Sequence, residues 1–407
     1  MSFTAAAAAG ILILTYAGVA VGRLPGLRLD RAGIALLGAA AMVAVGAISL
    51  EDAFHAIDLA TITLLLGMMI VVAHLKASGA FRALARLAID HAHAPTALLV
   101  AVTAMSGVLS AFLVNDAVCL AMAPMVVAVT RAIRRDPLPF LIATALASNC
   151  GGVATITGNP QNMVIGSLSG ISYIGFAARL APVAAFGLVA VALVVRWAYR
   201  AQFAEHVTID PHVPPGRMHR GQALKAAFVC AALALAFFAG VAPAKAALLG
   251  GAFLLLTRAV KPSRIYRELD GPLLIMFAGL FVVVAAAERT LLTPEIIGAA
   301  RDLGLDSVWR LSGLTAVLSN IVSNVPAVLA LKPFIPALHD PQRAWLTVAM
   351  SSTLAGNFTL IGSVANLIVA EYALKAGAPI GFWAYFKVGA PLTIVTLLAG
   401  AAWMAMT

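Results

Sequence analysis

Polar residues that could bind ions gather in a few short stretches of an otherwise apolar chain. SNCGGVATITGNPQN at 148–162 supplies hydroxyl and amide groups, and FLVNDAV at 112–118 supplies a carboxylate. Related stretches, SNIVSNVPAV at 319–328 and LAGNFTLIGSVANLIV at 354–369, follow later in the chain. Hydroxyl, amide and carboxylate oxygens can hold a cation, while N–H and O–H groups can hold an anion. These residues therefore predict ion or anion binding inside a membrane.

Residues 153–160 are expected to leave the helical conformation near the middle of the bilayer. Gly151 and Gly152 weaken a helix, Gly158 permits an open turn, and Pro160 has no N–H to donate. Unwound backbone survives at membrane depth only where protein buries it or a watery cavity faces it. Carbonyls freed at this break would favour a cation, and the N-terminus of the following half-helix would favour an anion.

Two sets of residues are assigned to the predicted site. The residues predicted to bind substrate are Asn115, Asn324, Ser323, Asn162 and Asn366. The residues predicted to hold a coupling ion, Na⁺ or H⁺, are Asp116, Thr155, Thr157, Gly158, Asn159, Thr359, Gly362 and Ser363. An acid at membrane depth is expensive, which favours a coupling role for Asp116 over a helix cap. For Asn115 and Asn324, ligand contact and satisfaction of the hairpin backbone both stay open.

Composition decides which elements must position these residues. With 62% hydrophobic and 11% charged residues over 407 positions, the chain is an all-α polytopic protein of the cell's inner membrane. The net charge of +10 comes from Lys and Arg in short clusters between apolar segments, which indicates topology rather than nucleic-acid binding. The three cysteines match no metal spacing and no disulfide framework, so neither a metal nor a cofactor is expected.

About ten transmembrane helices are expected from the apolar runs. They are read at 4–21, 32–48, 59–74, 138–166, 176–196, 223–240, 243–257, 271–287, 345–370 and 380–405. Two further apolar stretches remain. Both flanks of 96–130 are assigned to the cytoplasm and both flanks of 311–338 to the outside, so both stretches are predicted to be re-entrant hairpins. Two full crossings of a core about 30 Å thick would need about 40 apolar residues plus a turn, more than the first stretch offers.

The two halves of the chain are predicted to be inverted repeats. GVLSAFLVNDAV at 107–118 matches AVLSNIVSNVPA at 316–327, and TITGNPQN at 155–162 matches TLIGSVAN at 359–366. The predicted division is an N-terminal helix at 1–31, repeat 1 at 32–200, a linker and extra helix at 201–242, and repeat 2 at 243–407. Repeat 1 holds the hairpin 96–130 and the broken helix 138–166, and repeat 2 holds the hairpin 311–338 and the broken helix 345–370.

These motifs, in this order, resemble the ion transporter superfamily, and specifically its citrate-transporter-like branch with arsenite permeases and anion permeases. The resemblance implies a scaffold, a mobile transport domain, elevator-like movement and a homodimer. The related divalent-anion/sodium symporters carry Ser-Asn-Thr at both hairpin tips, whereas this chain has Val114-Asn115-Asp116 and Ser323-Asn324-Val325. The Asn-Asp tip looks more like the arsenite-permease branch.

The predicted function is secondary active transport of a small anion or oxyanion-type solute, arsenite-like, inorganic or carboxylate, coupled to H⁺ or Na⁺ by alternating access. The alternatives are a Na⁺/H⁺ antiporter of the same superfamily, for which the sequence shows no second intramembrane carboxylate to pair with Asp116, and an anion channel. No Walker motif, His-Glu-x-x-His pattern or nucleophile elbow occurs, so neither an enzyme nor an ATPase subunit is predicted. The expected partners are the substrate, the lipid bilayer and a second copy of the chain, without nucleic acid.

Overall fold

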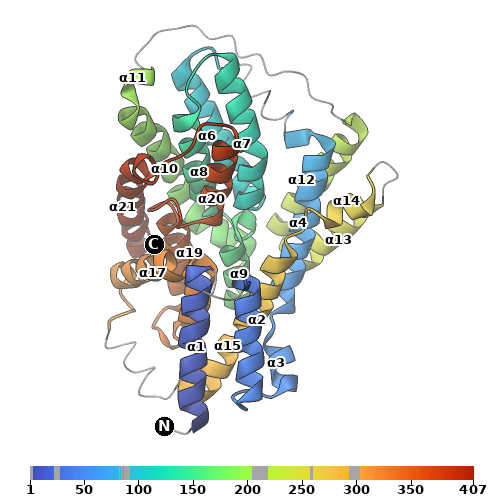
Figure 1. Ribbon diagram of the computed structural model, residues 1–407, viewed down its shortest axis with the longest axis vertical. Coiled ribbons are helices and arrows are strands. Elements are labelled where there is room, and N and C mark those ends of the chain that lie inside the picture. The colour runs from blue at the N-terminus through green and yellow to red at the C-terminus, as the bar shows by residue number, and fades with distance from the viewer. Residues whose placement is uncertain are drawn as a thin grey trace.

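The computed structural model describes residues 3–22, 28–81, 83, 86, 92–203, 219–256, 260–292 and 303–407. The secondary structure of these residues is helical throughout, which confirms the predicted all-α fold (Figure 1). Eight of the described helices are long and apolar enough to cross a membrane: α1 (Phe3–Val21), α4 (Leu59–Ser78), α6 (Pro95–Phe112), α7 (Asn115–Ala132), α10 (Tyr173–Ala198), α12 (Arg220–Phe238), α15 (Gly271–Leu291) and α21 (Phe382–Met406).

Shorter helices complete the predicted spans. Apolar helices that are too short for that group include α2 (Arg31–Ala44), α8 (Leu138–Gly152), α13 (Pro243–Leu255) and α17 (Val308–Val322). Every predicted span coincides with one helix or, at the two interrupted spans, with a pair of helices. Short helices α3 (Leu50–Ala56), α11 (Arg200–Phe203) and α14 (Pro262–Tyr266) lie in the connections.

The first predicted hairpin consists of α6 and α7, joined at Leu113 and Val114. Each arm has 18 residues and is therefore about 27 Å long at 1.5 Å per residue. Because the turn is so short, length alone does not separate this hairpin from two nearly complete crossings. The position of the tip identifies a re-entrant hairpin, because Asn115 lies beside the C-terminal turn of α8, where the interrupted span breaks.

The second hairpin consists of α17 and α18 (Asn324–Leu331), joined at Ser323. Ser323 has a φ of +76°, a left-handed conformation that is uncommon for a residue with a side chain. After α18, a 3-10 turn at Ile335–Ala337 leads to His339, whose N–H donates to Asp306 Oδ1 at 2.7 Å. Both ends of this hairpin therefore lie on one side of the molecule.

Each interrupted span is a pair of helices with an unwound segment between them. In the first, α8 ends at Gly152 and α9 (Pro160–Ser169) begins at Pro160, with the 3-10 turn Ile156–Gly158 between them. In the second, α19 (Pro341–Ala355) is followed by α20 (Val364–Lys375). The unwinding predicted at 153–160 is confirmed for residues 153–159. Pro160 is instead the first residue of α9, at N1, where its missing N–H is harmless.

The two hairpins enter from opposite ends of the molecule. The base of the first lies near the end of α20, since Arg131 of α7 donates to the carbonyl of Ala376. The base of the second lies near the end of α15, where Lys332 pairs with Glu288 at 3.0 Å. The same end of α15 pairs with α3 through Arg289 and Asp52. Figure 1 shows α3 and the bulk of α7 towards opposite ends of the molecule.

Two crossed helix pairs flank this core, α2 with α15 and α4 with α13. A Cβ added at Gly67 of α4 would lie 2.5 Å from the carbonyl carbon of Ala247 in α13, and one at Gly279 of α15 would lie 2.7 Å from that of Ala35 in α2. Only glycine allows such close approach between membrane helices. Gly67 corresponds to Gly279 and Ala35 corresponds to Ala247 in the two halves of the chain, because the members of each pair are separated by the same number of residues.

Candidate functional site

An asparagine side chain closes the first break. Asn162 Nδ2 donates to the carbonyl oxygens of Gly152 and Thr155, each at 3.0 Å. Asn159 caps α9, its Oδ1 accepting from the N–H of Asn162 at 2.8 Å. The carbonyls predicted to favour a cation thus accept hydrogen bonds from an amide, because buried backbone must find a partner inside the membrane.

The other residues of this break are fixed against neighbouring elements. Thr155 Oγ1 donates to the carbonyl of Ala111 in the first hairpin. Thr157 Oγ1 lies 2.8 Å from the hydroxyl of Tyr173, at the start of α10. A Cβ on Gly158 would lie 2.2 Å from the carbonyl oxygen of Gly152. All residues from 153 to 160 are buried, so this break is part of the packed core.

The second break repeats the same bonds. Asn366 Nδ2 donates to the carbonyl oxygens of Gly356 at 2.7 Å and Thr359 at 3.1 Å. A Cβ on Gly362 would lie 2.9 Å from the carbonyl oxygen of Gly356. Burial differs between the copies, since Ile361 is 67% exposed in the second break. The match between TITGNPQN and TLIGSVAN therefore reflects equivalent local structure with unequal packing.

Asn149, in the last turn of α8, joins the first hairpin to the second break. Its Oδ1 accepts from Asn115 Nδ2 at 3.0 Å and from Ser363 Oγ at 3.1 Å. Its Nδ2 donates to the side-chain oxygens of Asn357 at 2.9 Å and Asn366 at 3.1 Å. One buried amide thus fixes the tip of the first hairpin relative to the second interrupted span.

Thr353, in the last turn of α19, makes the reciprocal connection to the first break. Its hydroxyl oxygen accepts from Asn159 Nδ2 and from Gln161 Nε2, both at 3.1 Å. Thr353 itself donates to the carbonyl of Ala349 at 2.8 Å. Each half of the chain therefore holds the broken helix of the other half through side-chain hydrogen bonds.

A small cavity of about 50 Å³ lies between the two hairpin tips. The first residues of α7, α9, α18 and α20 all line it, so four helices begin at one place. The polar residues of its lining are Arg31, Asn115, Asp116, Gln161, Ser323, Asn324 and Ser363. Helix N-termini carry partial positive charge and N–H groups without an intrahelical partner, and here four of them converge in a cavity that Arg31 also lines.

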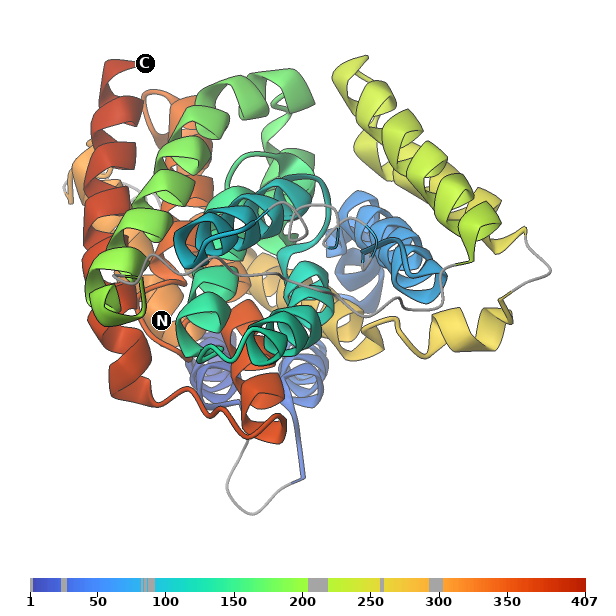
Figure 2. The same ribbon diagram turned by 90° about the horizontal axis from the view of Figure 1, so that it is seen from above.

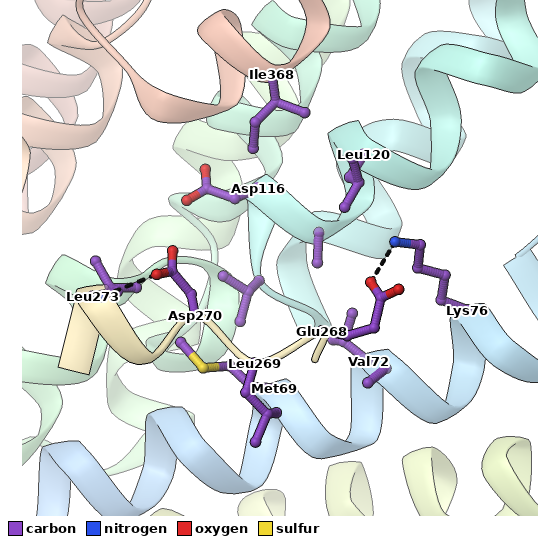
Figure 3. Close-up of a pocket in the computed structure, with 13 residues that line it drawn as sticks. Met69, Val72, Lys76, Asp116, Leu120, Glu268, Leu269, Asp270, Leu273 and Ile368 are labelled. Atoms are coloured by element: carbon purple, nitrogen blue, oxygen red, sulfur yellow. Dashed lines mark hydrogen bonds and ion pairs between the residues drawn. The ribbon is translucent and has the colours of Figure 1, made fainter. Parts of the chain in front are cut away.

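Asp116 also lines a second, adjoining cavity of about 230 Å³ (Figure 3). Asp270, which caps α15 by accepting from the N–H of Leu273 at 3.0 Å, lies on a facing wall of this cavity. Lys76 and Glu268 form an ion pair of 2.5 Å farther along it. The sequence led us to expect no second carboxylate beside Asp116, and Asp270 corrects that expectation. In the sequence, Asp270 looks like an ordinary helix cap in a loop, and nothing there indicates that it lies beside Asp116.

The structure divides the predicted site residues into two groups. The group that lines the cavity between the tips is Asn115, Asp116, Ser323, Asn324 and Ser363. The group that builds the breaks without lining this cavity is Thr155, Thr157, Gly158, Asn159, Asn162, Thr359, Gly362 and Asn366. Residue type alone does not distinguish them, because the same amide can face a ligand or satisfy backbone carbonyls.

Several residues of the site were not predicted. Asn149 and Gln161 lie inside the stretch that was singled out, and their polarity at membrane depth was a usable signal. Thr353 and Asn357 flank the second break in the same way. Arg31 was given no role in the predicted site, yet it starts α2 and lines the cavity between the tips.

Comparison with known proteins places the chain among membrane transporters. Residues 11–355 match the family model described as "Citrate transporter". An uncharacterized transporter of Mycobacterium tuberculosis is 30% identical over 401 residues, which cover 93% of this chain and 94% of that protein. A silicon efflux transporter of rice, Oryza sativa subsp. japonica, is 27% identical over 448 residues, which cover 92% of this chain and 92% of that protein.

The fold is also found in a solved structure. The YdaH transporter of Alcanivorax borkumensis superimposes with a TM-score of 0.67 at 16% sequence identity. The match covers 100% of this chain and 98% of that chain. At this level of identity the likeness establishes a shared helical architecture.

Proposed function

We propose that this chain, which belongs to the citrate transporter family, is a secondary active transporter of a small anion or oxyanion-type solute. Transport would proceed by alternating access, with H⁺ or Na⁺ as the coupling ion. The observation that carries the proposal is the cavity where four helices begin beside Arg31. A homodimer, which the resemblance to the superfamily implies, is part of the proposal.

The electrostatics of this cavity support an anion or an oxygen-rich solute. Helix N-termini bind anions through N–H groups and the helix dipole. The guanidinium of Arg31 adds a full positive charge and a fork of donors that suits oxyanions. The hydroxyls of Ser323 and Ser363 supply further donors at the tip and at the start of α20.

The volume supports a solute with few atoms. A cavity needs about 10–15 Å³ of this measure to hold one water molecule. A volume of about 50 Å³ therefore suits a tetrahedral or trigonal oxyanion better than a tricarboxylate in this conformation. One relative is named as a silicon efflux transporter. An arsenite-like, inorganic-anion or small carboxylate substrate fits within these limits.

Asp116 supports coupling to a cation. Its carboxylate lines the same cavity as Arg31, so an ionised Asp116 beside a bound anion is electrostatically unfavourable. A proton or a Na⁺ ion at Asp116 removes that repulsion, and the two ligands then bind with positive coupling. Such coupling is what a symporter requires.

Asp270 favours a second candidate function, Na⁺/H⁺ antiport. Two carboxylates on facing walls of one cavity can exchange a proton for a metal cation without any anion. Under this alternative the cavity of about 230 Å³ is the ion path, and the helix N-termini around Arg31 have no substrate to bind.

One experiment separates these functions. Purified protein in proteoliposomes would be assayed for uptake of arsenite, antimonite, phosphate, sulfate, citrate and Na⁺ under imposed pH and Na⁺ gradients. We expect one oxyanion-type solute to accumulate, and we expect unlabelled solute on the trans side to accelerate exchange. Failure of every anion together with Na⁺/H⁺ exchange supports the antiporter, and flux without trans acceleration supports a channel.

A further inference from the structure

Residues of α12, of the hairpin arm α6 and of the end of α4 line a large apolar groove. Figure 2 shows how these three helices are arranged. Its volume is about 830 Å³, within the range of about 300–1,000 Å³ that holds a drug-sized ligand. Large side chains in its wall are left uncovered by protein: Leu224 is 74% exposed, Val108 55% and Phe112 40%. The groove lies apart from the cavities that Asp116 lines, and no step proposed above uses it.

Small residues on α12 create the space. Ala223, Ala227, Ala231 and Ala234 follow one another at helical spacing along the face that lines the groove. α12 packs against α4 and α13, and its C-terminal end packs against Tyr173 at the start of α10. From Arg220 to Ala234 the helix rises about 21 Å, more than half of a hydrocarbon core about 30 Å thick.

Arg220 is the charged residue among the described residues that line the groove, and it lies at the first position of α12. No described residue forms an ion pair with it. The nearby Lys225 is already engaged, since its Nζ donates to the carbonyls of Phe253 at 2.8 Å and Leu256 at 2.7 Å. Among the described residues, the groove therefore has one cation without an ion-pair partner, at the end of a long apolar surface.

We propose that this groove binds an anionic phospholipid, with an acyl chain along α12 and α6 and the phosphate at Arg220. Three observations support this occupant: an apolar lining on spanning helices, a length suited to an acyl chain, and the positive charge of Arg220 at one end. Basic sites between transmembrane helices bind anionic head groups in this way. A lipid here connects α12 to the hairpin that carries Asn115 and Asp116.

Native mass spectrometry of the full chain tests the proposal. Delipidated protein in detergent would be titrated with dioleoyl phosphatidylglycerol, comparing Ala231→Trp with Ala232→Trp. Both positions are exposed on α12, but Ala231 lines the groove and Ala232 does not. We expect Ala231→Trp to lower the occupancy of one bound lipid at least fivefold and Ala232→Trp to leave it unchanged. Arg220→Gln should weaken phosphatidylglycerol binding and leave phosphatidylcholine binding unchanged.

A chemical measurement keeps the test independent of the variants. Cys230 lines the groove, whereas Cys119 and Cys150 are fully buried. Phosphatidylglycerol should therefore slow alkylation of Cys230 by N-ethylmaleimide in the unmodified protein. Equal lipid retention by the two Trp variants overturns the proposal, as does unchanged alkylation. A loss of dimer in Ala231→Trp at unchanged lipid occupancy would instead identify an interface between copies.

Discussion

Asp116 is the acidic residue that lines both described cavities, the small one between the hairpin tips and the larger one beside α15. Its side chain is half-buried, and it follows Asn115, whose amide is held by Asn149. The backbone that carries Asp116 is thus fixed by a hydrogen bond, while its carboxylate faces open space. This arrangement suits a group that must gain and lose a cation.

Asp116→Asn should uncouple transport while preserving the fold. The substitution keeps the shape of the side chain and removes the charge, so the proton or Na⁺ no longer assists anion binding. We expect gradient-driven accumulation to fall by about 5- to 150-fold, the range for a coupling free energy of about 1–3 kcal/mol. Accumulation would be measured in proteoliposomes from pH 5.5 to 8.5, with passive exchange as the control. Unchanged accumulation across that range would make Asp116 a structural residue.

For individual residues, the sequence predicted which polar side chains lie at the centre of the molecule, but it predicted only some of their roles. The tips at Asn115 and Asn324 were expected at the site, and both line the cavity. Asn162 and Asn366 were expected to face substrate, and their Nδ2 atoms instead bond backbone carbonyls. Side-chain direction inside an unwound segment depends on packing between halves, which one residue's type does not contain.

Among the elements, the interrupted spans were the most predictable. Glycine and Pro160 mark the first break within one residue of where the helices end and begin. The hairpins were predicted from flanking charges. The two-residue turn of the first hairpin was not predicted, and it weakens the argument that the stretch is too short for two full crossings. Arg31 shows the same limit, because a charge near a helix start can serve topology or a site.

Gly158→Ala should disrupt the first break. The added methyl group would lie 2.2 Å from the carbonyl oxygen of Gly152, a backbone atom that cannot rotate away. We expect a loss of about 1–3 kcal/mol in stability, as for an overpacked core, together with loss of transport. Thermal denaturation in detergent would measure it. Gly221→Ala is the matched control, because a Cβ there meets nothing within 4 Å. Equal melting temperatures for both variants would contradict a close-packed break.

Over the whole molecule, the two halves are connected at their most polar points. Asn149 reaches the second break and Thr353 reaches the first, so neither broken helix is complete without the other half. Outside the core, the Gly67 and Gly279 contacts also join helices from opposite halves. Sequence matching found the hairpins and the breaks. It missed the flanking helix pairs, because Ala, Leu and Gly repeat too often to stand out.

The sides assigned to the hairpin bases can be tested by labelling. In a Cys230→Ser background, cysteines at Arg134 and Lys375 should react with a membrane-impermeant maleimide from the cytoplasm only. A cysteine at His339 should react from outside. All three positions are exposed, so reactivity reports side rather than burial. Reaction of the Arg134 and His339 positions from the same side would remove the basis for inverted repeats.

The unequal burial of the two breaks has a consequence for their dynamics. Residues 153–160 are all buried, whereas Thr359, Leu360 and Ile361 are partly or mostly exposed. Opening the second segment disrupts fewer packed contacts, so it should open locally at a lower free energy. Deuterium exchange followed by mass spectrometry should show faster amide exchange at 359–361 than at 155–157. Equal protection would mean that both segments open together, and slower exchange at 359–361 would reverse the order. If the second segment opens first, the C-terminal half of the chain is the half that rearranges first when the occupied site changes sides of the membrane.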